Sequence, residues 1–219
     1  MMGDKVLKVK VCGLTQLPQI QKLILMKVEF LGFIFYEKSP RYVLNHLSLK
    51  DISKIDHQGK TGVFVNETIE NIVEITQKAK LNLIQLHGDE DEEFILSLRQ
   101  RLSEEVKIIK VMRIGNQTLE NLQQTISHQP SAINYLLFDT DSKSFGGTGQ
   151  TFDWSMLNDI EIHKPYFLSG GISLKNSQHL STINQQPFAL DINSKFEIEP
   201  GIKDIEKIKE FLKKSKNEI

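Results

Sequence analysis

The sequence of 219 residues contains one cysteine, Cys12, so it can form no internal disulfide and no cluster of cysteine ligands around a metal. It has no large excess of one charge either, because 27 basic and 28 acidic side chains leave a formal net charge of -1. That balance argues against proteins that bind nucleic acids or membrane surfaces, which normally carry a basic excess or stripe. A small anionic ligand is compatible with it, since a local site can bind one.

Long apolar segments are also missing. No apolar run approaches the about 20 residues that cross a bilayer, and residues 1–8 contain no apolar core of a secretory signal. We therefore expect a cytoplasmic protein with no membrane contact. The composition is that of a folded chain, with 39% hydrophobic and 25% charged residues. No linker rich in Pro, Gly or Ser divides the chain, so we expect residues 1–219 to form a single domain.

Eight short apolar or β-branched runs alternate with longer segments of helical periodicity. The runs are residues 6–12, 30–35, 61–65, 83–86, 106–112, 135–138, 166–168 and 188–192. This order predicts an α/β fold, a (β/α)8 TIM barrel whose parallel strands are joined by right-handed crossovers. A doubly wound open sheet is the alternative, which is weakened because no Gly-x-Gly-x-x-Gly motif follows the first run.

The intervening segments fit amphipathic helices, the first of which we expect Thr15 to cap. The expected helices are residues 16–27, 48–55, 68–79, 90–102, 118–127, 173–181 and 204–214, with 153–160 less regular. Lysines crowd the end of the last one, where they favour the negative end of the helix dipole.

Polar side chains end or follow the apolar runs, at the strand ends where (β/α)8 barrels carry their chemistry. They are Cys12, Arg41, His87, Asp139, Asp191, Asn193 and Ser194, with Gly170 and Gly171 after the seventh run. Because successive strand side chains alternate between two faces, several polar groups share one face. The residues that share a face along each strand are Lys10 with Cys12, Gln85 with His87, Leu137 with Asp139, and Ala189 with Asp191. We expect this face to point into the barrel.

Each residue alone has a simpler explanation. A lone cysteine at a strand end is more often a small buried hydrophobe than a catalyst. Asp139 could be an ordinary turn acid, Arg41 a solvated loop cation, and His87 a residue that helps to end its strand. Asp141 and Lys143 are expected to be exposed loop charges.

Two turns of small residues indicate a phosphate site. Gly170 and Gly171 precede an expected helix start, whose free N–H groups and dipole attract anions. Asn193 and Ser194 supply the next turn, and barrels often bind phosphate between the turns after their seventh and eighth strands. The glycine-rich segment 146–149 is a less favoured location.

Several strings run in order along nearly the whole chain. They are KVCGLT at 10–15, GFIF at 32–35, SPRYV at 39–43, GVFVN at 62–66, QLHG at 85–88, LLFD at 136–139, GGTG at 146–149, FDW at 152–154, LSGGI at 168–172 and DINS at 191–194, followed by Glu197, Pro200-Gly201 and Lys203-Asp204. Together they resemble the phosphoribosylanthranilate isomerase family of tryptophan biosynthesis. One position departs from it, since Lys195 stands where the family commonly has glycine.

The resemblance implies a compact barrel that catalyses the Amadori rearrangement of N-(5-phosphoribosyl)anthranilate to the aminodeoxyribulose phosphate, without a metal or an organic cofactor. It implies Cys12 as general base, Asp139 as general acid, and Arg41 as the residue that holds the substrate carboxylate. We also expect His87 and Asp191 to bind the substrate. Its phosphate should lie on Gly170, Gly171, Asn193 and Ser194. A monomer and a homodimer are both compatible with the sequence.

This chemistry suits the residue types. A carboxyl group can protonate a ring oxygen if burial or neighbours raise its pKa. A thiol acts as a base only as thiolate, so Cys12 needs an electropositive site, and Lys10 is the expected source of that field.

Three other functions fit these residues less well. The related histidine-pathway isomerase should carry acids at strand ends one and five, where this chain has Cys12 and Met112-Arg113. Indoleglycerol-phosphate synthase should carry lysine and glutamate at the mouth, and Lys10 lies too deep in its strand to decide this. A barrel that only binds a sugar phosphate or a partner protein is disfavoured by the presence of both Cys12 and Asp139.

Overall fold

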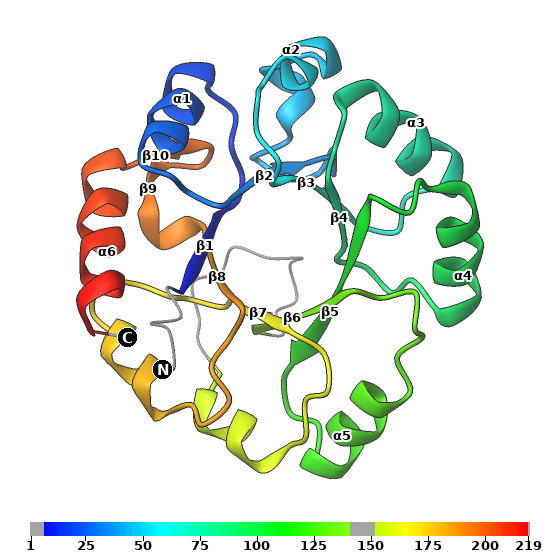
Figure 1. Cartoon of the computed structure of the whole chain (residues 1–219), viewed down its shortest axis with the longest axis vertical. Helices are drawn as coiled ribbons and strands as arrows, with labels where there is room; N and C mark the ends of the chain where they lie inside the picture. Colours follow the sequence, from blue (N-terminus) through cyan, green and yellow to red (C-terminus); the bar gives the residue numbers. More distant parts are fainter. Residues whose placement is uncertain (1–6, 141–151, 219) are drawn as a thin grey trace.

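Eight parallel strands pair in chain order, and the last pairs with the first (Figure 1). The computed structural model describes residues 7–140 and 152–218. The strands are β1 Lys8–Val11, β2 Phe30–Ile34, β3 Lys60–Phe64, β4 Leu83–Leu86, β5 Lys107–Ile114, β6 Tyr135–Thr140, β7 Tyr166–Leu168 and β8 Ala189–Ile192. The closed barrel predicted from the sequence is confirmed, and the open-sheet alternative is wrong.

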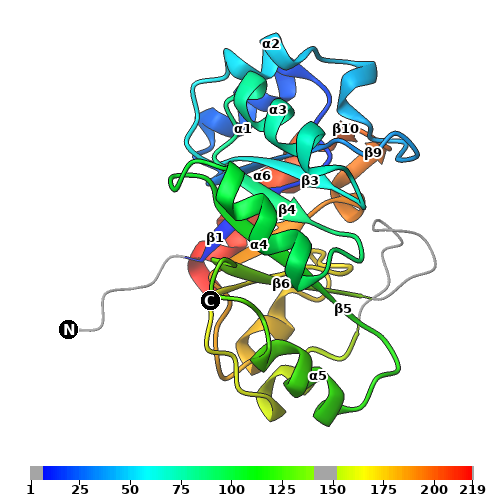
Figure 2. The same cartoon turned by 90° about the vertical axis from the view of Figure 1, so that its right-hand side faces the viewer.

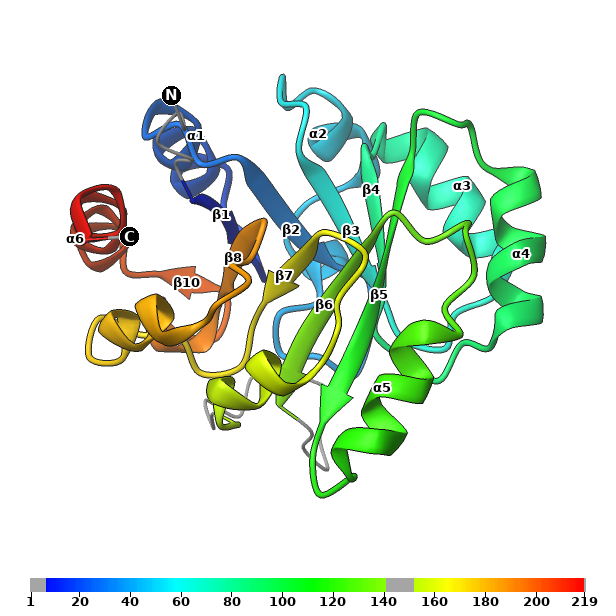
Figure 3. The ribbon, with the colours of Figure 1, turned by 60° about the horizontal axis from the view of Figure 1, so that its bottom comes forward.

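Helices surround the barrel, and α6 packs beside α1 to complete the ring (Figures 1 and 3). The α-helices are α1 Leu17–Leu25, α2 Leu49–Ser53, α3 Ile69–Ala79, α4 Glu92–Arg101, α5 Leu119–Ser127 and α6 Ile205–Glu218. Side chains of Ser48, Thr68, Asp91 and Thr118 accept hydrogen bonds from backbone N–H groups of the first turns of α2 to α5. None of the described helices has the length and apolar character needed to span a bilayer.

Short 3-10 helices replace α-helices between α5 and α6 (Figure 1). The four 3-10 helices of the described residues are η1 Val43–Asn45, η2 Trp154–Asp159, η3 Ser177–Thr182 and η4 Ser194–Phe196. The prediction of an α-helix over 173–181 is therefore wrong. The Asn176 side chain accepts a hydrogen bond from the Ser173 N–H at 2.8 Å, and such local side-chain bonds compete with helix formation.

A hairpin that the sequence did not predict follows the barrel. It consists of β9 Glu197–Glu199 and β10 Ile202–Lys203. Figure 2 places it at the barrel end toward which the strands point. The Thr15 hydroxyl donates to the Gly201 carbonyl at 2.7 Å, so it holds this hairpin. For that reason the expected capping role of Thr15 is wrong, and Gln16 precedes α1 without a side-chain cap.

The two faces of the strands bury different side chains. Val9, Val11 and their equivalents pack outward against the helices, whereas a second apolar cluster fills the barrel interior. The interior cluster consists of Leu83, Ile109, Val111, Leu137, Phe167 and Ala189. Because Leu137 and Ala189 face inward, Asp139 and Asp191 do so too, as the alternation predicted.

Aromatic rings close the amino-terminal end of the barrel. Phe167 is fully buried. The centre of its ring lies 5.2 Å from that of Phe30, 5.5 Å from that of Tyr135 and 5.7 Å from that of Phe188, each in an edge-to-face arrangement. The Lys8 ammonium lies 4.2 Å from the centre of the Phe188 ring. Edge-to-face pairs and this cation–π contact stabilise the ring cluster beyond its burial of apolar area. The four rings form an aromatic plug, which supports the buried polar side chains of Lys10, Gln85 and Asp191 above it.

We expect Phe167→Ala to lower the free energy of unfolding by about 3–5 kcal/mol, because it leaves a cavity among three rings. Urea unfolding followed by circular dichroism measures this. The control is Leu25→Ala, at a side chain that is 82% exposed, which should change stability by less than about 0.5 kcal/mol. Equal stabilities of the two variants would show that the plug contributes little.

Candidate active site

A buried ion pair occupies the barrel interior above the aromatic plug. The Lys10 ammonium of β1 lies 2.9 Å from Asp191 Oδ2 of β8 and 2.8 Å from Gln85 Oε1 of β4. All three side chains are buried, and Lys10 has no exposed surface. The inward direction predicted for Lys10 is therefore confirmed. Burial alone would lower the pKa of Lys10, but the carboxylate of Asp191, together with Cys12 where it is ionised, outweighs burial and raises that pKa.

The second carboxylate oxygen of Asp191 is buried and has no hydrogen-bond partner among the described residues. Burial raises the pKa of Asp191, although the charges of Lys10 and Lys203 oppose that shift. Leaving a buried acceptor without a donor is unfavourable. This oxygen is therefore ready to accept a hydrogen bond from a molecule that enters the barrel.

Cys12 directly follows β1, where its backbone N–H donates to the Ile192 carbonyl at 2.9 Å. Burial raises the pKa of its thiol, the nearby Lys10 and Lys203 charges lower it, and the Asp191 charge raises it again. The net shift is upward, so the unliganded protein holds a thiol rather than a thiolate at neutral pH. The field expected from Lys10 is thus present, but Asp191 and burial offset it.

Asp139 is the residue before the last one of β6 and is 8% exposed. Its Oδ1 accepts a hydrogen bond from the Thr140 N–H at 2.9 Å. Burial and the negative charge of Asp191 raise the pKa of Asp139 to about 6, against the lowering effect of the Thr140 N–H. A carboxyl group with this pKa is protonated in a fraction of the molecules near neutral pH, and a general acid must be protonated to act.

His87 lies beside Asp139, with 3.5 Å between His87 Nε2 and Asp139 Oδ2. Its Nδ1 is 3.0 Å from the amide nitrogen of Gln85. Burial and the positive charges of Lys10, Arg113 and Lys110 lower the pKa of His87 to about 3, so the ring is neutral. His87 therefore acts as a hydrogen-bonding group, and it contributes no positive charge to the site.

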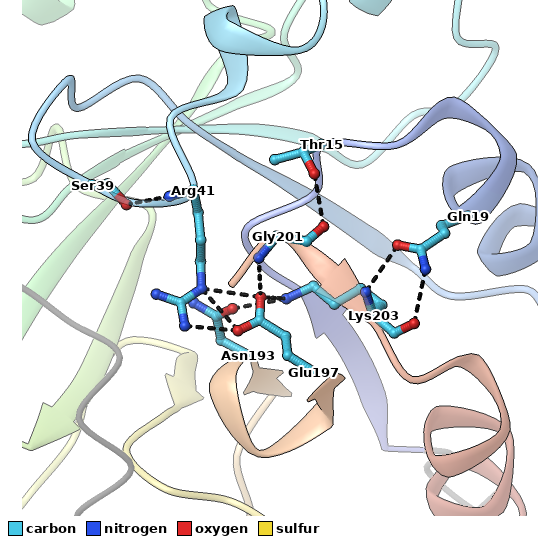
Figure 4. Close-up of polar contacts among 8 residues, drawn as sticks. All are labelled: Thr15, Gln19, Ser39, Arg41, Asn193, Glu197, Gly201 and Lys203. Carbon is cyan, nitrogen blue, oxygen red and sulfur yellow. Dashed lines mark hydrogen bonds and ion pairs between the residues drawn. The ribbon is translucent and has the colours of Figure 1, made fainter. Parts of the chain in front are cut away.

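Arg41 takes part in a second charged cluster at the mouth (Figure 4). Its Nε and Nη2 donate to both carboxylate oxygens of Glu197 at 2.7 to 3.0 Å, a bidentate pair. The Lys203 ammonium lies 2.7 Å from Glu197 Oε1 and 2.8 Å from Asn193 Oδ1. Although burial opposes it, these donors hold the pKa of Glu197 below its ordinary value. Two cations thus share one carboxylate and leave a net positive charge.

Glu197 and Lys203 are site residues that sequence reasoning missed as functional groups. Their positions depend on the β9–β10 hairpin, and only the spacing around Pro200-Gly201 gave a sign of that turn. Gly13, with φ of +73°, is also part of the arrangement, since a Cβ there would lie 2.7 Å from Arg41 Cδ. Gly13 therefore lets Arg41 cross over the end of β1.

The predicted phosphate residues lie on neighbouring turns after β7 and β8. Gly170 has φ of +84°, and a Cβ there would lie 2.5 Å from Thr140 Oγ1, so this turn passes close to the end of β6. Helix η4 begins at Ser194, and the first N–H groups of a helix have no partner within it. Lys195 is exposed.

One of the expected features for anion binding differs, and another lies outside the described residues. The helix dipole expected beyond Gly171 is absent, because η3 begins only at Ser177 and the Ser173 N–H is already bonded to Asn176. The alternative location at 146–149, together with Asp141 and Lys143, lies outside the described residues. Among residues 7–140 and 152–218, no three His, Cys, Asp or Glu side chains are grouped as metal ligands.

Comparison with known proteins identifies the family. The sequence profile described as N-(5'phosphoribosyl)anthranilate (PRA) isomerase matches residues 9–214. Proteins named N-(5'-phosphoribosyl)anthranilate isomerase from Parabacteroides distasonis and Thermoanaerobacter pseudethanolicus are 37% and 36% identical over 207 and 209 residues. These alignments cover 93% and 94% of this chain, and 91% and 97% of the relatives.

Solved structures agree with the sequence comparison. The crystal structure of phosphoribosyl anthranilate isomerase from Thermotoga maritima superposes with a TM-score of 0.76 at 31% identity, over 96% of this chain and 98% of that one. A crystal structure of a phosphoribosyl anthranilate isomerase in complex with reduced 1-(o-carboxyphenylamino)-1-deoxyribulose 5-phosphate gives a TM-score of 0.75 at 29% identity, with the same coverage. The chain therefore belongs to the N-(5'-phosphoribosyl)anthranilate isomerase family.

Proposed function

We propose that the chain is the isomerase that its family membership indicates, and that Cys12 is the base and Asp139 the acid of the Amadori rearrangement of N-(5'-phosphoribosyl)anthranilate. One observation carries the proposal. A buried thiol and a carboxyl group of raised pKa end strands β1 and β6 on the interior side of one barrel, with Lys10 and Asp191 beside them. Acid–base chemistry of this kind needs only two such groups, held at the substrate.

The first step opens the ribose ring. The Asp139 carboxyl gives its proton to the ring oxygen while the C1′–O bond breaks and the nitrogen lone pair forms a C1′=N bond. The pKa of about 6 leaves roughly a tenth of Asp139 protonated at pH 7. The carboxylate that results accepts the Thr140 N–H, so its charge is stabilised after the proton has left.

The second step removes the proton from C2′. The Cys12 thiolate takes it, the electrons form a C1′=C2′ bond, and the iminium nitrogen becomes neutral. The enol then tautomerises to the ketone: C1′ gains a proton and the C2′ hydroxyl loses one. Lys10 and Lys203 favour the thiolate. The iminium adds another positive charge next to it, so the pKa of Cys12 should fall once the ring has opened.

Arg41 suits the substrate carboxylate rather than proton transfer. Glu197 occupies Nε and one N–H of Nη2. The remaining N–H groups at Nη1 and Nη2 can form a second bidentate contact with the anthranilate carboxylate. The unpartnered oxygen of Asp191 can accept a substrate hydroxyl, which would satisfy that oxygen on binding.

The phosphate fits the turns after β7 and β8, held by the backbone N–H groups of Gly170, Gly171 and Ser194. The open start of η4 at Ser194 supports this location. Lys195 is exposed and is not needed for this contact, and the Asn193 side-chain oxygen accepts a hydrogen bond from Lys203. Asn193 therefore serves the phosphate turn by its backbone and links that turn to the Arg41 cluster.

Activity is tested with the fluorescent adduct of anthranilate and phosphoribose, formed in situ and given to the purified chain. We expect the wild type to consume the fluorescence. Cys12→Ala and Asp139→Asn should each lose at least about 10²-fold in kcat, because general acids and bases contribute about 10²–10⁴-fold. Unchanged thermal unfolding of both variants is the control. Wild-type turnover in either variant would disprove the role of that residue.

The pH dependence of kcat/KM tests the acid assignment. Activity requires protonated Asp139 and deprotonated Cys12, yet the pKa of Asp139 is about 6 and the pKa of Cys12 is raised above its ordinary value. Below pH 6 kcat/KM should rise tenfold per pH unit, because thiolate forms while the acid stays protonated. Above pH 6 it should level off, because each further gain in thiolate is matched by a loss of the acid.

The Asp139→Asn variant is the matched control for this profile. The substrate's own phosphate also titrates near pH 6, and its contribution persists in the variant. If Asp139 is the acid, the residual activity of Asp139→Asn continues to rise above pH 6 with the thiolate. A variant that levels off at the same pH as the wild type would assign the plateau to the substrate and contradict the role of Asp139.

We expect Arg41→Ala to raise KM roughly 10- to 100-fold with a smaller change in kcat, since charged hydrogen bonds contribute about 1.5–3 kcal/mol. Glu197→Gln should raise KM less, because it loosens the orientation of Arg41 but keeps its charge. Glu199→Gln is the control, an exposed acid on the same hairpin, and it should leave KM unchanged. A large fall in kcat at constant KM would place Arg41 in the chemistry.

A further inference from the structure

The Gln85 amide connects the two ends of the buried polar layer. It lies on β4, is 1% exposed, and has both polar atoms engaged. Its Oε1 is 2.8 Å from the Lys10 ammonium, and its Nε2 is 3.0 Å from His87 Nδ1. Gln85 is thus the direct link between the ion pair beside Cys12 and the imidazole beside Asp139.

The direction of these hydrogen bonds is fixed by chemistry. An ammonium only donates, so the amide oxygen must be the atom that faces Lys10. The amide nitrogen also only donates, so His87 Nδ1 must be the acceptor. A neutral imidazole that accepts at Nδ1 carries its hydrogen on Nε2. The contact with Gln85 therefore selects one of the two tautomers of His87.

The selected tautomer presents an N–H to Asp139, whose Oδ2 is 3.5 Å from His87 Nε2. Asp139 Oδ1 already accepts the Thr140 N–H, so each carboxylate oxygen has a donor beside it. Burial and the positive charges of Lys10, Arg113 and Lys110 keep the ring neutral throughout the range in which Asp139 titrates. With Nδ1 engaged and Nε2 protonated, His87 cannot take the proton of Asp139.

We propose that Gln85 is a positioning residue that holds His87 in the Nε2–H tautomer, so that His87 stabilises the Asp139 carboxylate and leaves its proton for the substrate. The catalytic consequence rests on the proposed function, in which Asp139 is the acid. The tautomer itself does not, since it follows from the contacts of Gln85 alone.

The substitution Gln85→Glu tests this, because it keeps the size and the contact with Lys10 but replaces a donor by an acceptor. A carboxylate at 85 should draw the hydrogen of His87 to Nδ1, which leaves Nε2 as an acceptor toward Asp139. Gln85→Leu removes both contacts and should give a mixture of tautomers. Gln77→Glu, at an exposed amide on α3, controls for the added negative charge.

The first readout is the ¹⁵N NMR spectrum of the histidine rings, assigned with His87→Asn. We expect the Nε2–H pattern in the wild type and in Gln77→Glu between pH 6 and 8, and the Nδ1–H pattern in Gln85→Glu. An Nδ1–H tautomer in the wild type would overturn the proposal even if no variant folds. The same holds if Gln85→Glu keeps the Nε2–H tautomer.

The second readout is kcat in the isomerase assay. Gln85→Glu should lose about tenfold or more, yet less than Asp139→Asn, because the acid itself is still present. Wild-type kcat together with a switched tautomer would show that the tautomer does not serve Asp139. If the wild-type protein has no isomerase activity, the proposed function fails, whereas the NMR pattern still decides whether Gln85 fixes His87.

Discussion

The ion pair of Lys10 and Asp191 in the barrel interior organises the rest of the polar layer. Taking two charges out of water is expensive, and such a pair is favourable only when its other hydrogen-bonding positions are also used. Lys10 uses a second donor for Gln85, and its charge also acts on Cys12. Asp191 keeps one oxygen that has no partner within residues 7–140 and 152–218. The pair therefore places a positive charge beside the thiol and an open acceptor beside the substrate.

The same pair acts on the pKa values of both proposed catalytic groups. Asp191 raises the pKa of both Cys12 and Asp139, whereas Lys10 lowers both. Because the pair is nearly neutral as a whole, burial dominates and both groups favour their protonated forms. That state suits the carboxyl, which begins the reaction by giving a proton. The thiol becomes an effective base only when a positive charge develops on the substrate.

Much of this arrangement could be predicted from the sequence, because a (β/α)8 barrel has a simple period. The alternation along each strand correctly assigned Lys10, Asp139 and Asp191 to the interior. Val9 and Val11 face the helices, whereas Leu137 and Ala189 belong to the apolar cluster of the barrel interior. The β4 and β7 boundaries agree with prediction, and the other strands differ by a few residues at their ends.

What the sequence did not predict depends on contacts between distant segments. Thr15 has the residue type of a helix cap but bonds to Gly201, 186 residues away. The 173–181 segment has helical spacing, yet the Asn176 side chain bonds locally and leaves a 3-10 helix. Lys203 reaches the site only through the β9–β10 hairpin, a turn that no strand periodicity indicates. The periodicity of short segments therefore predicts the barrel, whereas parts of the site depend on contacts between side chains that lie far apart in the sequence.

The central claim is that Cys12 and Asp139 serve successive steps in one barrel interior. The most direct test compares kcat of Cys12→Ala, of Asp139→Asn and of the double variant. If the residues act in successive steps on the same substrate, the slower step limits turnover, so the double variant should be about as slow as the slower single variant. A double variant whose loss equals the product of the two single losses would contradict the account.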